Sequence, residues 1–155
     1  MKAMATLMSV LLMLTMWFRY PEEKRQGAET WIMAYFCGMT EEEFDLISRT
    51  VEAESDRSDN LEGRILIAEV ILNRVRSDIF PDTIEAVCTQ SGQFQVVYEG
   101  TIWSVGRTDL SDQAVMEALY RIELGEAPNV MYFNNSCYQY GEPYCYEGGN
   151  YFVTV

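Results

Sequence analysis

The amino-acid sequence predicts a mainly helical domain with a small amount of β-structure. Apolar residues recur near the helical period over Thr40–Glu54, Glu62–Arg76 and Ser111–Leu124. Two short apolar runs near the C-terminus, Val130–Phe133 and Tyr151–Val155, are typical of strands or extended segments. A chain of 155 residues fits one domain that can pack a core without disulfides or metals.

The N-terminus has the pattern of an export signal or membrane anchor. Lys2 is followed by an uncharged, mostly apolar run, Ala3–Phe18, which Arg19 closes. At about 16 residues the run is short for a full membrane span, although tilt or local thinning of the bilayer would accommodate it. The alternative is an apolar helix that packs on the domain, paired with Trp31–Cys37.

A linker is expected directly after this run. Residues 20–26 are charged and include Pro21, which interrupts regular structure. We therefore expect a signal peptide or anchor plus linker over residues 1–26 and one domain over residues 27–155. The core of that domain should lie at about residues 40–155.

The first helix of the domain is predicted from its cap and its period. Thr40 and Glu43 form a capping-box pattern at its start. The apolar residues that follow at helical spacings are Phe44, Leu46, Ile47 and Val51. Glu54 falls at the C-terminal end, before the polar turn Ser55–Asn60, and is well placed to project into a cleft.

The helix over Glu62–Arg76 is apolar nearly all round, which predicts a buried central helix. Its polar residues must therefore find partners. Asn73 and Arg74 are expected to brace a neighbouring loop by hydrogen bonds; the alternative is that one of them orients Glu54 or contacts a ligand. Glu69 is an acid inside this apolar helix and has no role that the sequence pattern explains.

A short helix and a β-hairpin are expected next. Pro81 disfavours helical geometry at the preceding residue, and Asp82 with Glu85 repeats the capping pattern of a short helix. The segments Gln93–Val97 and Thr101–Val105 surround a Tyr-Glu-Gly sequence, which predicts the hairpin.

The composition restricts the chemistry. The chain has no histidine, so Ser-His and Cys-His nucleophile pairs and imidazole zinc sites are absent, and a carboxyl shifted by burial becomes the simplest acid. The net charge of −13 argues against nucleic acid as a partner and against electrostatic retention on any anionic surface. The many tyrosines and tryptophans suit a sugar-binding cleft, although core packing explains most of them equally well.

The four cysteines, Cys37, Cys88, Cys137 and Cys145, lack the C-x-x-C spacing of a zinc ribbon. Cys137 and Cys145 bracket a Tyr/Gly/Pro-rich loop and could close a disulfide in an exported domain; the alternative is free thiols. A cysteine nucleophile is disfavoured because no histidine is present to activate it.

Four short motifs together carry a resemblance to a known family. They are Val51-Glu52-Ala53-Glu54, Ile71-Leu72-Asn73-Arg74-Val75, Phe80-Pro81-Asp82-Thr83 and Gln93-Phe94. As a set they resemble the core of the SleB/CwlJ-type cell-wall hydrolases, peptidoglycan-cleaving enzymes first associated with spore-cortex breakdown. The resemblance implies a mainly helical, lysozyme-like α+β domain with a small β-hairpin or sheet, acting on peptidoglycan glycan strands. No metal site and no cofactor are predicted from the sequence.

The resemblance also implies a site. It makes Glu54 the catalytic acid and places Gln93 and Phe94 close to it. The turn after Glu54 departs from the family's usual A-E-A-R-G-E pattern by one extra residue, which leaves Asp56 and Asp59 as candidates for the second acidic position. A substrate in the cell wall implies action outside the cytoplasm, by a secreted or membrane-anchored protein.

Three functions, two of them catalytic, fit these residues. With one well-supported carboxyl, lytic transglycosylation at MurNAc–GlcNAc β-1,4 bonds is the most economical. A hydrolytic muramidase would need a second carboxylate as base or nucleophile. A non-catalytic peptidoglycan-binding or regulatory protein that keeps the fold is the third, and the altered turn after Glu54 motivates it.

Overall fold

The computed structural model describes residues 38–55 and 60–155. The chain divides into two compact units, Met1–Glu41 and Glu42–Val155, and the site lies in the second. The predicted leader and linker over residues 1–26, and Cys37, Asp56 and Asp59, lie outside the described residues. Within the described ranges, no helix combines the length and the apolar character that crossing a membrane requires.

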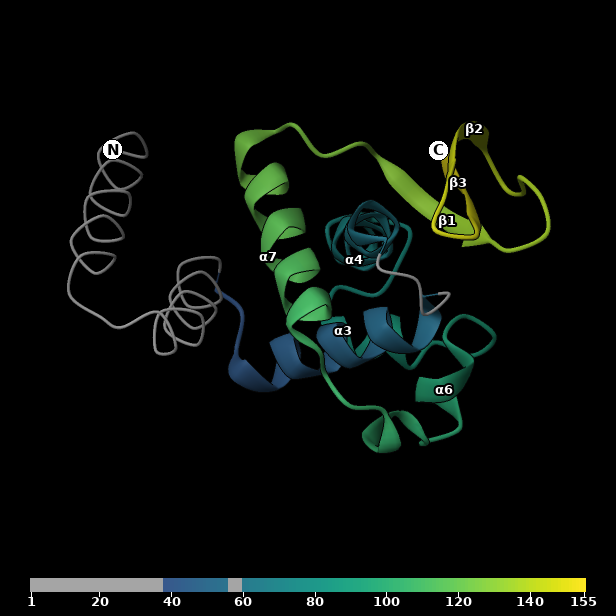
Figure 1. Cartoon of the computed structure of the whole chain (residues 1–155). Coiled ribbons are helices and arrows are strands. Elements are labelled where there is room, and N and C mark those ends of the chain that lie inside the picture. The colour runs from purple at the N-terminus through teal and green to yellow at the C-terminus, as the bar shows by residue number, and fades with distance from the viewer. Residues whose placement is uncertain (1–37, 56–59) are drawn as a thin grey trace, which may run out of the picture. The chain divides into compact units, whose positions relative to one another are not determined.

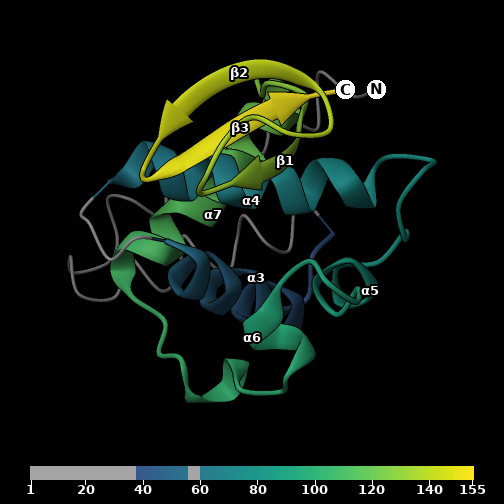
Figure 2. The same ribbon diagram turned by 90° about the vertical axis from the view of Figure 1, so that its right-hand side faces the viewer.

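The second unit is built around one central helix. The helices are α3 (Glu41–Glu54), α4 (Leu61–Val75), α5 (Ile84–Cys88), α6 (Gln95–Tyr98) and α7 (Asp109–Leu124), with a 3₁₀ turn η1 (Ile102–Ser104). The strands are β1 (Val130–Asn134), β2 (Glu142–Glu147) and β3 (Asn150–Thr154). Helix α4 packs against α7 and β1 (Figure 1). The sheet lies on one side of α4 and α3 on the other (Figure 2). The mainly helical α+β class that the sequence predicts is confirmed.

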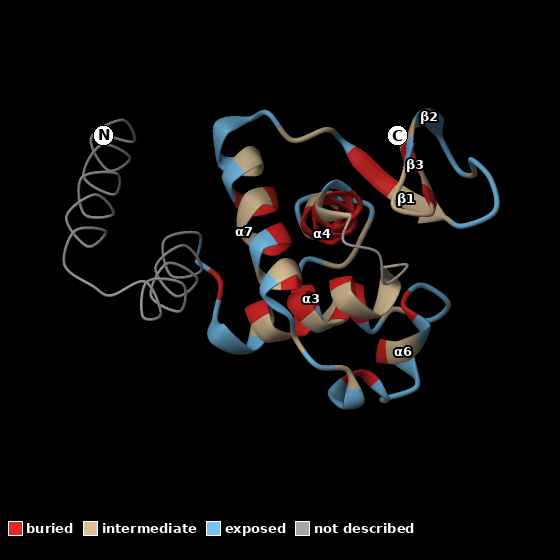
Figure 3. Cartoon of the chain, viewed as in Figure 1, coloured by how far each residue is buried: buried red, intermediate tan, exposed pale blue. Residues whose placement is uncertain are grey.

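Helix α4 forms the core of the unit. Every residue from Gly63 to Leu72 is buried (Figure 3). The side chain of Asn60 caps the helix by accepting a hydrogen bond from the Gly63 backbone N–H at 2.6 Å. An apolar surface all round a helix can be removed from water only if other elements cover every side, so the sequence pattern correctly predicted its central position.

Gly63 is where α4 meets the turn between β2 and β3. A Cβ atom added at Gly63 would lie 2.8 Å from the Gly148 Cα, closer than two such atoms can pack. Alanine in a helix interior is ordinarily more stable than glycine by about 1 kcal/mol. Because both groups at this contact are backbone, we expect Gly63→Ala to reverse that sign and to lower the free energy of unfolding by about 1–3 kcal/mol.

Urea denaturation measures this effect. Gly106→Ala is the matched control, because a Cβ there meets nothing within 4 Å and the φ of Gly106 is not in the left-handed region. We expect Gly106→Ala to change the free energy of unfolding by less than about 0.5 kcal/mol. A Gly63→Ala protein as stable as the parent would show that the β2–β3 turn can shift away from α4 without a loss of unfolding free energy.

The sheet is antiparallel with strand order β1-β3-β2. Phe133 of β1 lies opposite Phe152 of β3, with ring centroids 5.7 Å apart, and Phe152 is fully buried. The strands predicted at Val130–Phe133 and Tyr151–Val155 are both present. Strand β2 was not predicted, because its Tyr/Pro-rich sequence resembles a loop and its pairing partner, β3, is what makes it a strand.

The predicted β-hairpin over Gln93–Val97 and Thr101–Val105 is wrong: α6 and η1 occupy these residues. The reason is the role of Gly100, whose φ is +71°. Its N–H donates to the Val97 carbonyl, and the Thr101 N–H donates to the Val96 carbonyl, both at 3.0 Å. These two bonds form a Schellman motif, so a glycine interpreted as a hairpin turn instead ends a one-turn helix.

Two helix starts differ from the predicted ones in detail. The side chain that caps α5 belongs to Thr83, which accepts from the Ala86 N–H, and not to Asp82. Helix α7 begins at Asp109, two residues before the predicted start at Ser111, because Thr108 and Ser111 form a capping box.

Candidate active site

Glu54 is the last residue of α3 and is half-buried. Phe44, Ile47 and Val51, which precede it at spacings of three and four residues, are buried and hold this side of the helix in place. Burial raises the pKa of the Glu54 carboxyl, and no charge among the described residues contributes to the shift. A carboxyl in this state keeps its proton to a higher pH than usual and remains partly accessible, as a general acid requires.

A second carboxylate, Glu52, lies two residues before Glu54 but serves a structural purpose. One of its oxygens lies 3.4 Å from Arg64 Nη2 of α4, and the other accepts a 2.7 Å hydrogen bond from the Thr108 hydroxyl. Residues two apart on a helix do not share a face. Glu52 therefore links α3 to α4 and to the start of α7, while Glu54 points elsewhere.

Ser55 and Asn60, the described residues on either side of residues 56–59, both make defined hydrogen bonds. The Ser55 N–H donates to the Val51 carbonyl at 3.1 Å and continues the helical pattern past Glu54. At the far end, the Asn60 side-chain amide donates to Glu147 Oε1 of β2 at 2.6 Å. Ser55 thus extends the helical pattern of α3, and Asn60 ties the start of α4 to the β2–β3 end of the sheet. Residues 56–59, with Asp56 and Asp59, lie outside the described residues.

Asn73 and Arg74 brace the chain that leads into β1. The Asn73 side-chain amide donates to the carbonyls of Pro128 and Val130 at 2.9 and 3.0 Å. Arg74 Nε donates to the Met131 carbonyl at 2.8 Å. These hydrogen bonds hold a neighbouring segment in place, as the sequence predicts. A contact of either side chain with substrate stays a prediction.

The Arg74 guanidinium lies among three aromatic rings. Its Cζ atom is 5.0 Å from the ring centroid of Phe80, 5.6 Å from that of Phe94 and 5.1 Å from that of Tyr132. Burial lowers the pKa of Arg74 to about 10. Phe94 is fully buried in this arrangement and serves the core, whereas Gln93 is exposed. That Gln93 and Phe94 adjoin Glu54 stays a prediction.

Glu69 is the most unusual carboxyl that sequence reasoning left unexplained. Its side chain is fully buried, and Arg121 Nη1 of α7 lies 3.7 Å from Oε1. The same guanidinium binds both oxygens of Glu62 at 2.7 Å and lies 3.4 Å from Glu117. Burial raises the pKa of Glu69 to about 7, with Arg121 opposing the shift and Glu62 and Glu117 adding to it. An acid closed off from solvent cannot reach a glycan, so Glu69 belongs to the α4–α7 interface and Glu54 remains the candidate acid.

The described cysteines are all free thiols, so the disulfide considered between Cys137 and Cys145 is not formed in the structure. Cys137 is exposed, and Cys145 is half-buried in β2. Burial raises the pKa of the Cys88 thiol to about 12, which makes a thiolate nucleophile there unfavourable.

Solved structures of the same fold are catalytic domains of SleB proteins. The catalytic domain of the germination-specific lytic transglycosylase SleB from Bacillus anthracis superimposes with a TM-score of 0.63 at 25% identity, covering 76% of this chain and 98% of that one. The catalytic domain of the Bacillus cereus SleB protein gives the same TM-score and identity, covering 74% and 91%.

Sequence comparison leads to the same proteins. The spore cortex-lytic enzyme of Oceanobacillus iheyensis is 34% identical over 82 residues, which is 53% of this chain and 29% of the relative. The Bacillus subtilis enzyme of that name is 30% identical over 97 residues, 63% of this chain and 31% of the relative. The chain thus spans less than a third of the length of these relatives. Residues 58–152 match the Cell Wall Hydrolase family, a match that begins after Glu54. The chain belongs to the Cell Wall Hydrolase family, of the SleB/CwlJ type that its four motifs predict.

Proposed function

We propose that this domain cleaves the glycan strand of peptidoglycan at MurNAc–GlcNAc β-1,4 bonds as a lytic transglycosylase, with Glu54 as the general acid. The observation that carries the proposal is the state of Glu54: a half-buried carboxyl with a raised pKa at the C-terminal end of a packed helix. The similarity to a protein named a germination-specific lytic transglycosylase supports the reaction class.

One carboxyl suffices for both halves of the reaction. Protonated Glu54 gives its proton to the oxygen that links MurNAc to GlcNAc, and that bond breaks as oxocarbenium character develops at C1 of MurNAc. The Glu54 carboxylate then accepts the proton of the MurNAc 6-hydroxyl, whose oxygen attacks C1. The product is a 1,6-anhydro-MurNAc end, and Glu54 regains its proton for the next turnover. The attack is intramolecular, which favours it over attack by water.

Hydrolysis is the alternative and would need a second carboxylate. Glu52 is unsuited, because both its oxygens are engaged by Arg64 and Thr108. Asp56 and Asp59 remain the candidates for that role. A glycan-binding protein without activity is the third possibility, and it would bind sacculi without altering them.

Mass spectrometry of digested sacculi separates the three. We expect soluble muropeptides that end in 1,6-anhydro-MurNAc and resist reduction by borohydride. Reducible MurNAc ends would instead mean hydrolysis with a second carboxylate. Reducing GlcNAc ends would show that the GlcNAc–MurNAc bond is cleaved instead, which would disprove the transglycosylase assignment. Intact sacculi would favour the binding protein.

The proposed substrate lies outside the cytoplasm, so we propose that the domain acts there. The route is the signal peptide or anchor predicted over residues 1–26, which stays a prediction because it lies outside the described residues.

A further inference from the structure

The sheet and the loop between β1 and β2 carry five tyrosines that pack in two groups, Tyr132 with Tyr140, and Tyr151 with both Tyr138 and Tyr146. The ring of Tyr132 also packs against Phe80. We call Tyr132, Tyr138, Tyr140, Tyr146 and Tyr151 the tyrosine cluster. Ring centroids are 5.5 Å apart for Tyr132 and Tyr140, 5.0 Å for Tyr138 and Tyr151, and 4.6 Å for Tyr146 and Tyr151. The strand register places Tyr146 and Asn134 opposite Tyr151, and Tyr132 opposite Val153. Opposed residues share a face, so the strand tyrosines project from the face opposite to Phe133 and Phe152.

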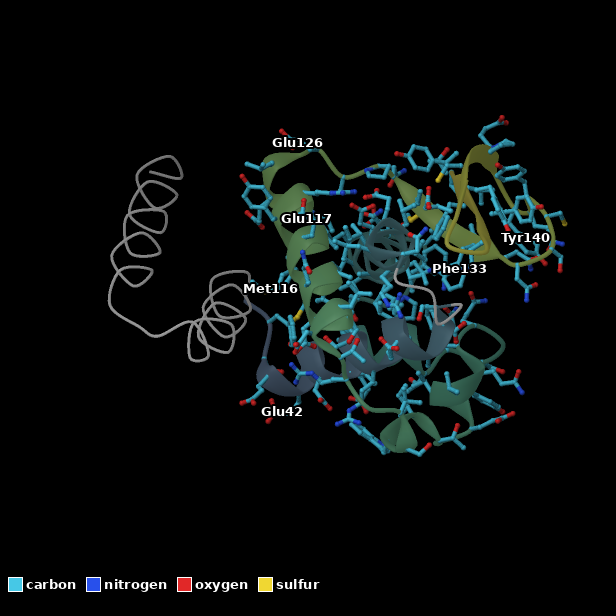
Figure 4. All side chains as sticks on the ribbon, viewed as in Figure 1. Glu42, Met116, Glu117, Glu126, Phe133 and Tyr140 are labelled. Atoms are coloured by element: carbon cyan, nitrogen blue, oxygen red, sulfur yellow. The ribbon has the colours of Figure 1, made fainter. Side chains whose placement is uncertain are left out.

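Two members of the cluster are presented to solvent by the loop between β1 and β2. Tyr140 is 76% exposed and has a φ of +68°, the left-handed region that a bulky residue adopts only at a cost of about 1–2 kcal/mol. In Figure 4, Tyr140 lies on the outer side of the sheet and Phe133 lies toward α4. The loop thus holds an apolar ring in water at the expense of its backbone, which core packing does not explain.

The segment that carries Tyr132, Tyr138 and Tyr140 is uncharged in a strongly acidic protein. Residues 127–141 contain no Asp, Glu, Lys or Arg, although the chain carries a net charge of −13. The loop instead supplies amide and hydroxyl groups, from Asn134, Asn135, Ser136 and Gln139, beside the rings. Flat aromatic faces with adjacent amides match pyranose rings, which have apolar C–H faces and hydroxyl or acetamido edges.

The end of the sheet that carries Tyr146 and Tyr151 is tied to the start of α4. The pair Tyr146 and Tyr151 is followed in the register by Glu147 and Asn150. Glu147 accepts a hydrogen bond from Asn60, the N-cap residue of α4. In Figure 1 the loop between β1 and β2 lies on the side toward which the C-terminal end of α3 points.

We propose that the tyrosine cluster is a glycan-binding surface that holds the sugar strand beyond the bond that Glu54 cleaves. The inference rests on the proposed function for its choice of glycan. It also explains how an acidic protein stays on an acidic wall: stacking on neutral sugar rings replaces the electrostatic attraction that its charge forbids.

Binding measured without cleavage tests the inference. In the full chain carrying Glu54→Gln, we would compare Tyr140→Ala combined with Tyr146→Ala against Tyr120→Ala, an exposed tyrosine of α7 outside the cluster. The probe is peptidoglycan sacculi free of teichoic acid, in a co-sedimentation assay, with the fold checked by circular dichroism. We expect the double variant to bind about tenfold more weakly or worse, Tyr120→Ala to bind as the parent does, and a soluble β-1,4-linked GlcNAc hexamer to compete.

Equal binding by the double variant would overturn the inference. So would a loss of binding that the GlcNAc hexamer does not reproduce by competition, since the tyrosines would then contact the stem peptides. Neither outcome bears on catalysis, which is tested separately by product analysis with Glu54 intact. In that active chain, the double substitution should raise the KM for sacculi and leave kcat within about twofold.

Discussion

Glu54→Gln is expected to lower the rate of glycan cleavage by about 10²–10⁴-fold, the contribution of a positioned general acid. Glutamine keeps the size and hydrogen-bonding capacity of the side chain but has no proton to give to the leaving oxygen. Because burial alone shifts the pKa of Glu54, removing its charge should leave the free energy of unfolding unchanged or slightly higher. The rate of release of soluble muropeptides from sacculi measures the first effect, and urea denaturation measures the second.

The pH dependence gives this prediction a second readout. The raised pKa of Glu54 means that cleavage by the parent should persist to a higher pH than an ordinary carboxyl would allow, and should then fall as Glu54 loses its proton. That descending limb should be missing from the residual activity of Glu54→Gln. Glu123→Gln, at an exposed position of α7, is the matched control and should cleave as the parent does. A Glu54→Gln protein with more than about a hundredth of parent activity would exclude Glu54 as the acid.

Glu69→Gln is expected to raise the free energy of unfolding above that of the parent, and to do so more at pH 8 than at pH 5. In the folded protein burial raises the pKa of Glu69 to about 7, whereas an unfolded glutamate has its ordinary pKa, near 4.5. The folded state therefore holds the proton more tightly, so this group's contribution to stability is complete below the ordinary pKa and is lost as the pH rises through about 7. The loss amounts to about 2–3 kcal/mol, and glutamine, which cannot ionise, should abolish it.

Urea denaturation between pH 5 and pH 8 tests this prediction. Glu62→Gln is the comparison variant, for which we expect the opposite change in the free energy of unfolding at pH 8. Arg121 lowers the pKa of Glu62, so the stability that Glu62 contributes is present above its ordinary pKa and lost as the pH falls. Glu62→Gln should therefore destabilise at pH 8, by less than about 1 kcal/mol because the pair is partly exposed. Parallel pH profiles for the parent and Glu69→Gln would mean that Arg121 compensates the buried charge fully.

The sequence identified the helices and the candidate acid because both depend on residues close together in the chain. Helical periodicity placed α3 and α4 within a residue or two of their observed bounds. The position of Glu54 at the end of α3 followed from the polar turn after it. The resemblance of four short motifs, spread from Val51 to Phe94, then indicated the family to which the chain belongs.

Where local patterns permit two structures, the sequence alone chose wrongly or not at all. A glycine with positive φ serves a hairpin turn and a helix end equally well, and at Gly100 the tertiary structure decided for the helix end. Strand β2 exists because β3 pairs with it. The raised pKa of Glu69 depends first on its burial in the packed unit and then on α7, which brings Arg121 and Glu117 near it. The grouping of the tyrosines depends likewise on the register of three strands and on the loop that folds over them. Such properties arise from atoms that only the folded chain brings together, whereas helix period and helix caps are set within a few residues of the chain itself.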